Sequence, residues 1–422
     1  MAAGGDRWAP GLAVPFRALA FALSALLGLL AGAAPAHALR SIPVTSGAVH
    51  VWQDQLPDDM TDAQVRFEAA HVDGTQKVSR QTAQRLRTVN PGFLVLHYRL
   101  GIGDGPVPFR IGDRWASDYA RVRGHSSWFW HEQGQRVLRT DSGWYLMNPT
   151  SGWRAYWARR VRLEAGLLDD DGVFADSLSV PQYLGASGFR PALAYFRGEA
   201  AWTSRVDSFM RYEEARLRGS LYFIPNAGSW ITTRDRTDYS IPDGVMIEGF
   251  AEGGANDHYA TGDWRLQMTR VLSLARLGRV VIAQSYLEPP DSVARGFVVA
   301  SYLLTQGQHS FLNMDIGIHA QWFPEYGLAL GPATDPLPAD IDTLRDPSGL
   351  YVRHFTGGLA AVNPDDQPHT LTLSHPGRLV VPVGGGELDA AADTSGWALA
   401  EHPVSGAVTV PAHGGAIVVA GS

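Results

Sequence analysis

Hydrophobic positions between residues 49 and 314 alternate between short apolar runs and longer amphipathic stretches. The short runs are rich in β-branched and aromatic residues, which is typical of buried strands, and the longer stretches carry an apolar stripe at helical spacing. We expect strands at 49–52, 93–98, 172–175, 220–224, 244–247, 279–284 and 310–314, with an eighth within 71–78. Helices are expected at 61–71, 80–89, 151–168, 202–218, 264–277 and 291–306.

This order of elements predicts an α/β fold, and within that class a (β/α)8 TIM barrel. Eight strands with crossover helices over this length match the usual size of such a barrel, which is roughly 250 residues. The alternative is an open, doubly wound sheet. It is less favoured because no glycine-rich turn leads from a strand into a helix.

The pattern changes near residue 350, where helical periodicity stops. Short strands are expected at 350–355, 358–363, 369–373, 378–381, 407–410 and 415–419, separated by Pro, Gly and Asp turns. These strands predict a small C-terminal all-β sandwich over 348–422, following a catalytic barrel over 39–347. The boundary is expected in the Pro-rich and Asp-rich segment 331–347.

Residues 1–38 have the pattern of a signal peptide. Arg7 and Arg17 precede an apolar run at 18–34, and Pro-Ala-His-Ala follows at 35–38. The run is shorter than the roughly 20 residues that span a bilayer comfortably. We therefore expect cleavage after Ala38, a secreted or periplasmic protein and no stable membrane insertion after cleavage; an uncleaved anchor is the alternative.

Composition narrows the possible chemistry. The formal charge of −7 gives no basic excess, so nucleic acid is not expected as a partner. The chain has no Cys, which excludes disulfides, thiol nucleophiles and iron–sulfur clusters. It also has no HExxH motif for zinc and no GxSxG motif of α/β-hydrolases. We expect no metal, no cofactor and a monomer.

Two acidic residues stand at the carboxyl ends of expected strands. Asp176 ends Gly-Val-Phe-Ala-Asp at 172–176, and Glu248 ends Gly-Val-Met-Ile-Glu at 244–248. In a TIM barrel all strands open their carboxyl ends onto one face, where catalytic residues lie, and these are the fourth and sixth strands. Two carboxylates facing each other are what glycoside hydrolysis requires, since one donates a proton and the other attacks or activates water. We therefore predict that Asp176 and Glu248 are catalytic.

Polar and aromatic residues near the same strand ends are candidates for holding a sugar. They are Asp54, His97, Arg99, Asn148, Asn226 and Gln284, each of which has a structural role as its alternative. The long segment 101–148 is rich in Trp, whose flat faces stack on pyranose rings. Substrate contact is expected for Trp128 and Trp130; for Trp144 and Tyr145 a packing role is equally open.

Several segments resemble a group of bacterial proteins catalogued as hypothetical glycosyl hydrolase 15-like. They are DGVFADS, GVMIEGF, FLVLHYRLG, NPTSGWR and the tail GLYVRHFTGGLAAVNPDD. The resemblance covers most of residues 45–420 and implies a TIM barrel with a C-terminal β-sandwich. It also implies that Asp176, on strand four, is the nucleophile and that Glu248, on strand six, is the general acid/base.

Together these observations predict an exported glycoside hydrolase that cleaves a poly- or oligosaccharide. Retention of anomeric configuration is expected, and inversion stays open because the sequence does not give the separation of the carboxyl groups. The alternative function is a catalytically silent, glycan-binding barrel in exopolysaccharide assembly or turnover.

Overall fold

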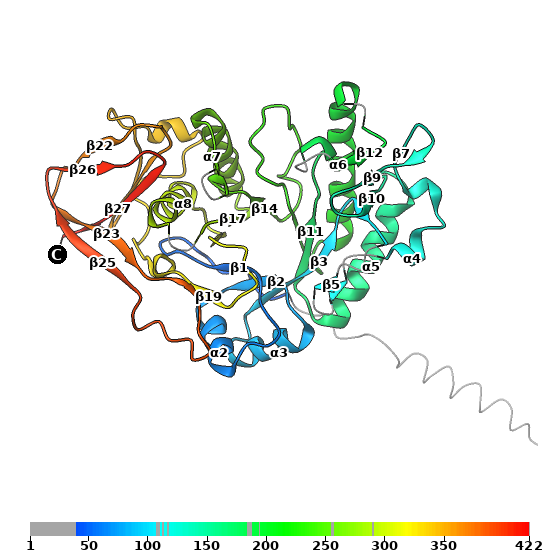
Figure 1. Cartoon of the computed structure of the whole chain (residues 1–422), viewed down its shortest axis with the longest axis horizontal. Coiled ribbons are helices and arrows are strands. Elements are labelled where there is room, and N and C mark those ends of the chain that lie inside the picture. The colour runs from blue at the N-terminus through cyan, green and yellow to red at the C-terminus, as the bar shows by residue number, and fades with distance from the viewer. Residues whose placement is uncertain are drawn as a thin grey trace, which may run out of the picture. The chain divides into compact units, whose positions relative to one another are not determined.

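A computed structural model describes residues 39–106, 110–111, 114–115, 118–183, 188–193, 195–254, 257–288 and 291–421. From Leu39 onward the chain forms one compact unit of mixed α/β structure (Figure 1). The expected signal peptide at 1–38 lies outside the described residues, so its cleavage stays a prediction. None of the helices in the described part of the chain has the length and apolar content needed to cross a bilayer.

Parallel strands form two sheets. The first has five strands in the order β1 (Trp52–Gln55), β2 (Gly74–Lys77), β3 (Leu94–Leu100), β11 (Gly172–Asp176) and β13 (Tyr222–Pro225). The second has three strands in the order β14 (Gly244–Glu248), β17 (Val280–Gln284) and β18 (Ser310–Asn313). Two isolated parallel bridges, Asn226 with Met246 and Val51 with Leu312, join the outer strands of one sheet to those of the other.

These eight strands lie where the hydrophobic pattern predicts them, except at the first, whose regular ladder begins at Trp52 rather than at residue 49. The helices between them also follow the pattern. They are α2 (Asp62–His71), α3 (Arg80–Val89), α5 (Gly152–Leu168), α6 (Tyr195–Leu217), α7 (Thr261–Arg276) and α8 (Ser292–Thr305). Helix α6 begins seven residues before the expected position.

One face of the parallel strands is apolar along most of its length. Trp52, Leu94, Leu96, Tyr98, Phe174, Ile224, Met246, Val280, Ile282 and Phe311 form a cluster of their own, separate from the larger core under the helices. Successive side chains of a strand alternate between its two sides, so a residue two positions later points the same way. On the same side as this cluster, each strand carries a polar side chain at or next to its carboxyl end; on β3 this residue is Tyr98, which also belongs to the apolar cluster. We call these the strand-end cluster: Asp54, Gln76, Tyr98, Asp176, Asn226, Glu248, Gln284 and Asn313.

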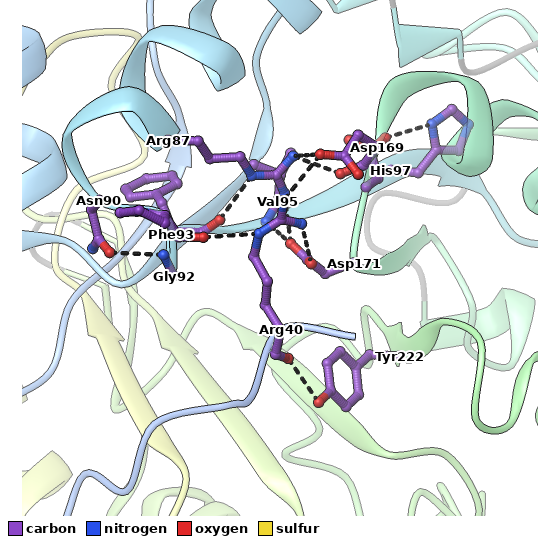
Figure 2. Close-up of polar contacts among 12 residues, drawn as sticks. Arg40, Arg87, Asn90, Gly92, Phe93, Val95, His97, Asp169, Asp171 and Tyr222 are labelled. Atoms are coloured by element: carbon purple, nitrogen blue, oxygen red, sulfur yellow. Dashed lines mark hydrogen bonds and ion pairs between the residues drawn. The ribbon is translucent and has the colours of Figure 1, made fainter. Parts of the chain in front are cut away.

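The amino ends of β3 and β11 are held by a separate group of charges. Asp171 accepts hydrogen bonds from Arg40 (2.8 Å) and Arg87 (2.7 Å), and from the backbone N–H of Val95 (2.8 Å). Asp169 contacts the same two arginines (Figure 2). This network ties Arg40 and α3 to the end of the strands opposite the strand-end cluster.

Short antiparallel strands form in the segments between the parallel strands. A four-stranded antiparallel sheet has the order β12 (Phe189–Arg190), β9 (Leu138–Arg139), β10 (Trp144–Leu146) and β4 (Gly103–Asp104). The remaining short pairs are β5 (Arg110–Ile111) with β6 (Arg114–Trp115), β7 (His131–Glu132) with β8 (Gln135–Arg136), β15 (Glu252–Gly254) with β16 (Asp257–His258), and β19 (Gln321–Trp322) with β24 (Gly386–Glu387). A one-turn helix α4 (Tyr119–Val122) and four 3₁₀ turns complete the description: Ser126–Trp128, Pro181–Tyr183, Pro324–Gly327 and Ile341–Leu344.

The C-terminal strands form antiparallel sheets. One has the order β20 (Tyr351–Phe355), β21 (Gly358–Asn363), β27 (Gly414–Ala420), β23 (Gly377–Val383) and β25 (Ala398–Val404). A second pairs β22 (His369–Thr372) with β26 (Ala407–Val410). A shared apolar cluster includes Val352, Ala361, Leu371, Val408 and Val418. Strand β25 was not expected from the sequence, because its AEHP segment lacks an apolar alternation.

The larger C-terminal sheet packs directly on α8 (Figure 1). The two backbones approach so closely that a Cβ atom at Gly415 would stand 2.1 Å from the carbonyl oxygen of Gly296. Helix α8 is buried on nearly all sides. It also packs on α7, and its Tyr302 hydroxyl donates to the carbonyl of Ser310 in β18 at 2.6 Å. A helix that is apolar all round belongs to the interior, and here β21 and β27 supply the outer layer.

Candidate active site

A cavity of about 860 Å³ opens at the carboxyl ends of the parallel strands. Its floor includes Tyr98, Asp176, Asn226 and Glu248, all members of the strand-end cluster. The walls come from loops and short strands and are formed by Leu100, Gly105, Arg139, Asp141, Ser142, Gly143, Trp144, Ser177, Tyr183, Gly228, Ser229, Ile231, Gly249, Gly253, Asp257, Tyr259 and Tyr286. The volume falls in the range of about 300–1,000 Å³ that is common for small-molecule sites.

Asp176 is the last residue of β11, and three donors surround its carboxylate. The Tyr98 hydroxyl donates to Oδ2 at 2.5 Å, while the backbone N–H of Ser177 (2.7 Å) and the Asn226 amide (2.9 Å) donate to Oδ1. Donors aimed at a carboxylate stabilise its negative charge. Ser177 has a φ of 54°, a left-handed conformation that is uncommon for a residue with a side chain and clusters at functional sites.

Glu248 ends β14 and also has a partner on each carboxylate oxygen. The Tyr286 hydroxyl donates to Oε1, and the Asn226 amide donates to Oε2. Burial, followed by the neighbouring charge of Asp176, raises the pKa of Glu248 to about 7. A substantial fraction of Glu248 therefore carries its proton near neutral pH, which is what a general acid needs.

Asn226 connects the two acidic residues. Its Nδ2 atom contacts Oδ1 of Asp176 and Oε2 of Glu248 at the same time. Its backbone is fixed on both sides, since its N–H donates to Ala175 of β11 at 3.0 Å and the next N–H, of Ala227, donates to Met246 of β14 at 3.0 Å. Because both oxygens touch one nitrogen atom, they lie within about 6 Å of each other, which is twice a hydrogen-bond length.

A buried ion pair lies beside the acidic pair. Lys77 Nζ donates to Asp54 Oδ2 at 2.6 Å, and Gln76 donates to Asp54 Oδ1 at 2.5 Å. The Lys77 ammonium also lies 5.1 Å from the centre of the Tyr98 ring. Burial opposes the charge of Lys77, but Asp54, Asp176 and Glu248 outweigh it and raise the pKa of the ammonium above its usual value.

A family model describes residues 87–359 of this chain, a range that includes Tyr98, Asp176, Asn226 and Glu248. The chain belongs to hypothetical glycosyl hydrolase family 15. The match spans more than half of the sequence and confirms the resemblance that the strand-end motifs indicate. By family, the chain is a glycoside hydrolase. A search of curated proteins found no match.

Similar solved structures are also glycoside hydrolases. The hydrolase domain of PelA from Pseudomonas aeruginosa is 16% identical, with a TM-score of 0.41 over 64% of this chain and 96% of that one. The maltogenic α-amylase AmyB from Thermotoga neapolitana is 13% identical, with a TM-score of 0.42 over 88% and 98%. Ega3 from Aspergillus fumigatus, solved with galactosamine, is 13% identical, with a TM-score of 0.36 over 60% and 82%. At these similarities no residue role or substrate is transferred from them.

Three of the expected site residues gather at the cavity, namely Asp176, Glu248 and Asn226. Asp54 and Gln284 belong to the strand-end cluster but do not line the cavity. Asp54 is engaged by Lys77 and Gln76, and Gln284 accepts from Asn313 at 2.8 Å and donates to the Ser285 carbonyl at 2.8 Å. Both side chains are buried and support the floor of the site.

His97 and Arg99 lie away from the cavity, which corrects the expectation that they contact a sugar. Both are fully buried on the side of β3 that faces α5. His97 contacts Glu164 and Asp170, and Arg99 contacts Glu164 (2.9 Å) and Asp118 (2.8 Å). Figure 2 shows the His97 ring beside the Arg40 and Arg87 network, in contact with a carboxylate. Strand alternation is the cause, because the cavity side of β3 carries Tyr98 and Leu100 instead.

Trp128, Trp130 and Asn148 also do not line the cavity, contrary to expectation. Trp128 stacks on His125 with ring centres 4.0 Å apart, and Trp130 packs on Trp202 of α6 at 4.7 Å. The Asn148 side chain accepts from the backbone N–H and hydroxyl of Thr150, which fixes the turn before α5. Segment 101–148 thus uses these aromatic residues to attach itself to the helices.

Sequence reasoning missed or left open several cavity residues, among them Tyr98, Tyr286 and Trp144. Tyr98 was hidden by its position between the more polar His97 and Arg99, although it lies two residues after Leu96 in the apolar cluster. Tyr286 follows β17 in a loop, where no strand register predicts its direction. Trp144, at the start of β10, was open between packing and substrate contact; its ring packs on Phe189 and also lines the cavity.

Proposed function

We propose that this protein hydrolyses a glycosidic bond of a poly- or oligosaccharide with retention of anomeric configuration, using Asp176 as nucleophile and Glu248 as general acid/base. The observation that carries the proposal is the shared contact of Asn226 with both carboxylates. Their nearest oxygens lie within about 6 Å, which favours the roughly 5–5.5 Å separation of retaining enzymes over the roughly 6.5–9.5 Å of inverting ones.

The reaction would proceed in two steps. Protonated Glu248 gives its proton to the glycosidic oxygen while an Asp176 oxygen attacks the anomeric carbon, so the leaving sugar departs as an alcohol and a glycosyl ester forms on Asp176. Ionised Glu248 then takes a proton from water, the water oxygen attacks the anomeric carbon, and the ester bond breaks. Asp176 leaves as a carboxylate and Glu248 is again protonated.

The environments of the two acids suit these different roles. Glu248 has its pKa raised to about 7 by burial and by Asp176, so it can hold a proton at neutral pH. Asp176 receives three hydrogen bonds, which fix the position of its carboxylate beside Glu248. An acid that holds a proton at neutral pH next to a fixed second carboxylate is the arrangement of a general acid and a nucleophile.

We further propose that the eight parallel strands close into a (β/α)8 barrel at 39–347, with the C-terminal sheets forming a β-sandwich at 348–422. The bridges between Asn226 and Met246 and between Val51 and Leu312 support closure, because they join the free edges of the two parallel sheets. A continuous apolar cluster from alternate strand positions is what a filled barrel interior requires. The cavity then lies at the face where TIM-barrel enzymes carry their active sites.

Aromatic side chains line the cavity on more than one side and are suited to pyranose faces. Trp144, Tyr183 and Tyr259 are the residues we assign to sugar contact, in place of Trp128 and Trp130. The Arg139 guanidinium is paired with Asp141 at 2.9 Å on the same wall, so this pair offers hydrogen bonds and no large net charge.

The experiment is a comparison of the purified protein with Asp176→Asn and Glu248→Gln on a panel of bacterial polysaccharides, measured by release of reducing ends. We expect turnover by the unaltered protein and a loss of at least about 1,000-fold in each variant, with a single cooperative thermal unfolding transition retained in both variants. Near-normal activity in either variant would remove that residue from the mechanism.

The stereochemistry is tested by proton NMR of the first product anomer, which should match the anomer of the substrate. An inverted first product would exclude Asp176 as nucleophile. If the unaltered protein binds a polysaccharide in calorimetry but releases no reducing ends, the glycan-binding alternative replaces the hydrolase.

A further inference from the structure

Lys77 is the only lysine in a chain whose 35 basic residues are otherwise arginines, and it lies beside the two proposed catalytic acids. It ends β2, and its side chain is largely buried against the Asp54 carboxylate at 2.6 Å. Asp54 in turn is almost completely buried, with its second oxygen held by Gln76 at 2.5 Å. This pair therefore forms a closed unit beneath the cavity and has no part in the two-step reaction described above.

A short path leads from the ion pair to the nucleophile. The Lys77 ammonium lies 5.1 Å from the centre of the Tyr98 ring, and the hydroxyl of that ring donates to Asp176 at 2.5 Å. Tyr98 is buried, so water does not screen this path as it would at the surface. Lys77 is thus separated from Asp176 by one aromatic ring.

Every charged group that faces Lys77 within the strand-end cluster is acidic: Asp54 from β1, Asp176 from β11 and Glu248 from β14. Tyr98 from β3 adds a hydroxyl that acts as a donor, and Tyr286 adds a second one at Glu248. Asp54 and Lys77 act on Glu248 in opposite directions, with Asp54 raising and Lys77 lowering the pKa of Glu248. Three carboxylates and one ammonium thus share a small buried volume.

We propose that the Lys77–Asp54 pair is a positioning element that sets the protonation of Glu248 without touching the substrate. This inference rests on the proposed function, since it assigns Glu248 a catalytic role. The ammonium favours a charged Glu248, and Asp54 limits that effect so that Glu248 keeps a proton near neutral pH.

The test measures the protonation of Glu248 without any substrate. The free energy of unfolding is compared between Glu248→Gln and its parent across pH 4–9, in four backgrounds: unaltered, Asp54→Asn, Lys77→Met and the double variant. The pKa of Glu248 is higher in the folded protein than in the unfolded chain, so Glu248 loses stability as pH rises, and the gain from Glu248→Gln levels off above the folded pKa. The pH at which the gain levels off is therefore a direct measure of the pKa of Glu248 in the folded protein.

We expect this pH to fall in Asp54→Asn, where the ammonium acts unopposed, and to rise in Lys77→Met, where Asp54 acts unopposed. Each shift should be about one pH unit, the size expected of a unit charge several ångströms away at an effective dielectric constant of about 20. The double variant should return to the unaltered value because a neutral pair has been replaced by two neutral groups. Lys77→Arg, which keeps the charge, is the matched control and should leave the value unchanged.

The proposal is overturned if the pH of levelling off is the same in all four backgrounds, or if it shifts in the same direction in both single variants. A purely structural pair would change stability without moving this pH. If Lys77→Met fails to fold because Asp54 is left buried and unpaired, Asp54→Asn and the double variant still decide the matter. Because no sugar is needed, these results stand apart from whether the protein hydrolyses a glycan. On a hydrolysed substrate, the alkaline limb of kcat/KM should move with the same signs.

Discussion

Tyr98 and His97 are neighbours in the chain and serve different parts of the molecule. The Tyr98 hydroxyl contacts Asp176 in the cavity, while His97 contacts Glu164 and Asp170 on the opposite side of β3. From side-chain chemistry alone, histidine is the more usual functional residue. Here the strand register places Tyr98 on the cavity side instead, because Tyr98 continues the apolar row of Leu94 and Leu96 and His97 does not.

After the two acids, Asn226 is the residue whose substitution should reduce activity most. In Asn226→Leu, both carboxylates lose a shared donor while the branched shape of the side chain is kept. We expect kcat to fall about 100-fold, the usual effect of removing one buried donor from an active site. The hydrogen bond from Asn226 lowers the pKa of Glu248, so its removal should also move the alkaline limb of activity to higher pH.

The control for Asn226→Leu is Gln284→Leu, which changes a buried amide of the same cluster that does not contact either acid. Its effect should be on stability with no movement of the alkaline limb. An alkaline limb that stays in place in Asn226→Leu would show that Asn226 does not influence Glu248.

Activity should depend on pH through the proton of Glu248. Its pKa of about 7, raised by burial and by Asp176, predicts that kcat/KM declines as pH rises through about 7, because the general acid is then ionised. The measurement is a pH profile of kcat/KM on any hydrolysed glycan. A profile that stays flat to pH 9 would contradict this assignment of the general acid.

The acidic pair was predictable from the sequence because each acid directly follows a short apolar run that opens with glycine, at 172 and 244. Asn226 was predictable because it stands two residues after Ile224 of another apolar run. Lys77 and Tyr286 were not, because one ends a strand with little apolar content and the other lies in a loop. The positions of side chains in segment 101–148 depend on contacts with α5 and α6, which no local pattern encodes.

At the scale of elements, segment 101–148 divides its aromatic residues between two tasks. The 3₁₀ turn at Ser126–Trp128 and the following residues place Trp128 and Trp130 on helices, whereas β9 and β10 present Arg139, Asp141 and Trp144 to the cavity. Strand pairing explains the difference, since β10 is held between β9 and β4 in an antiparallel sheet. The hairpin from Leu138 to Leu146 is therefore the part of this segment that can contact a sugar.

Trp130→Ala and Trp144→Ala should separate these tasks. Trp130→Ala removes the contact with Trp202 and is expected to cost about 2 kcal/mol of stability while leaving KM unchanged. Trp144→Ala also opens the cavity wall and should raise KM about tenfold. Thermal unfolding and steady-state kinetics on both variants make the comparison; a raised KM in Trp130→Ala alone would restore the original expectation.

The helices and strands were predicted more successfully than the site, for a physical reason. Periodicity reports which face of an element is buried, and burial decides most of α2, α3, α5, α7 and α8. Helix α6 shows the limit, because the sequence of its first two turns, from Tyr195, includes Arg, Gly and Glu and does not give a continuous apolar stripe. Strand β25 shows it too, since it pairs with β23 through its backbone and not through an alternating pattern.

Across the whole molecule, buried carboxyl groups should make stability decrease as the solution becomes more alkaline. Burial raises the pKa of Glu213 to about 9, and neither of its carboxylate oxygens accepts a hydrogen bond from the described part of the chain. A raised folded-state pKa means that the contribution to stability is complete below the ordinary value of 4.5 and is lost as pH rises toward 9.

Glu213→Gln should therefore stabilise the protein at pH 8–9, on the order of 2 kcal/mol, and have little effect at pH 4. Glu214→Gln is the matched control, because the neighbouring Glu214 is paired with Arg218 at 3.0 Å and loses only that contact. Thermal unfolding from pH 4 to 9 is the measurement. Equal effects of the two substitutions at all pH values would exclude Glu213 as the source.

The contact between α8 and the C-terminal sheet should make residues 39–421 unfold as one cooperative unit. Gly415→Val would force a side chain into the backbone of Gly296, and we expect a loss of about 3 kcal/mol and a single unfolding transition. Gly406→Val is a suitable comparison because a Cβ atom there meets open space, although its positive φ adds a smaller strain. Two separate transitions in calorimetry would show that the sheets melt independently.

Helix α8 also bears on the order in which the protein can fold during synthesis. The 108 residues from 306 to 413 separate the end of α8 from the start of β27, whereas β21 lies much nearer to α8 in the chain. Until Gly414–Ala420 has left the ribosome, β21 is available to cover the outer face of α8 and β27 is not. The outer layer of α8 is therefore complete only when two strands from distant parts of the chain have both been made.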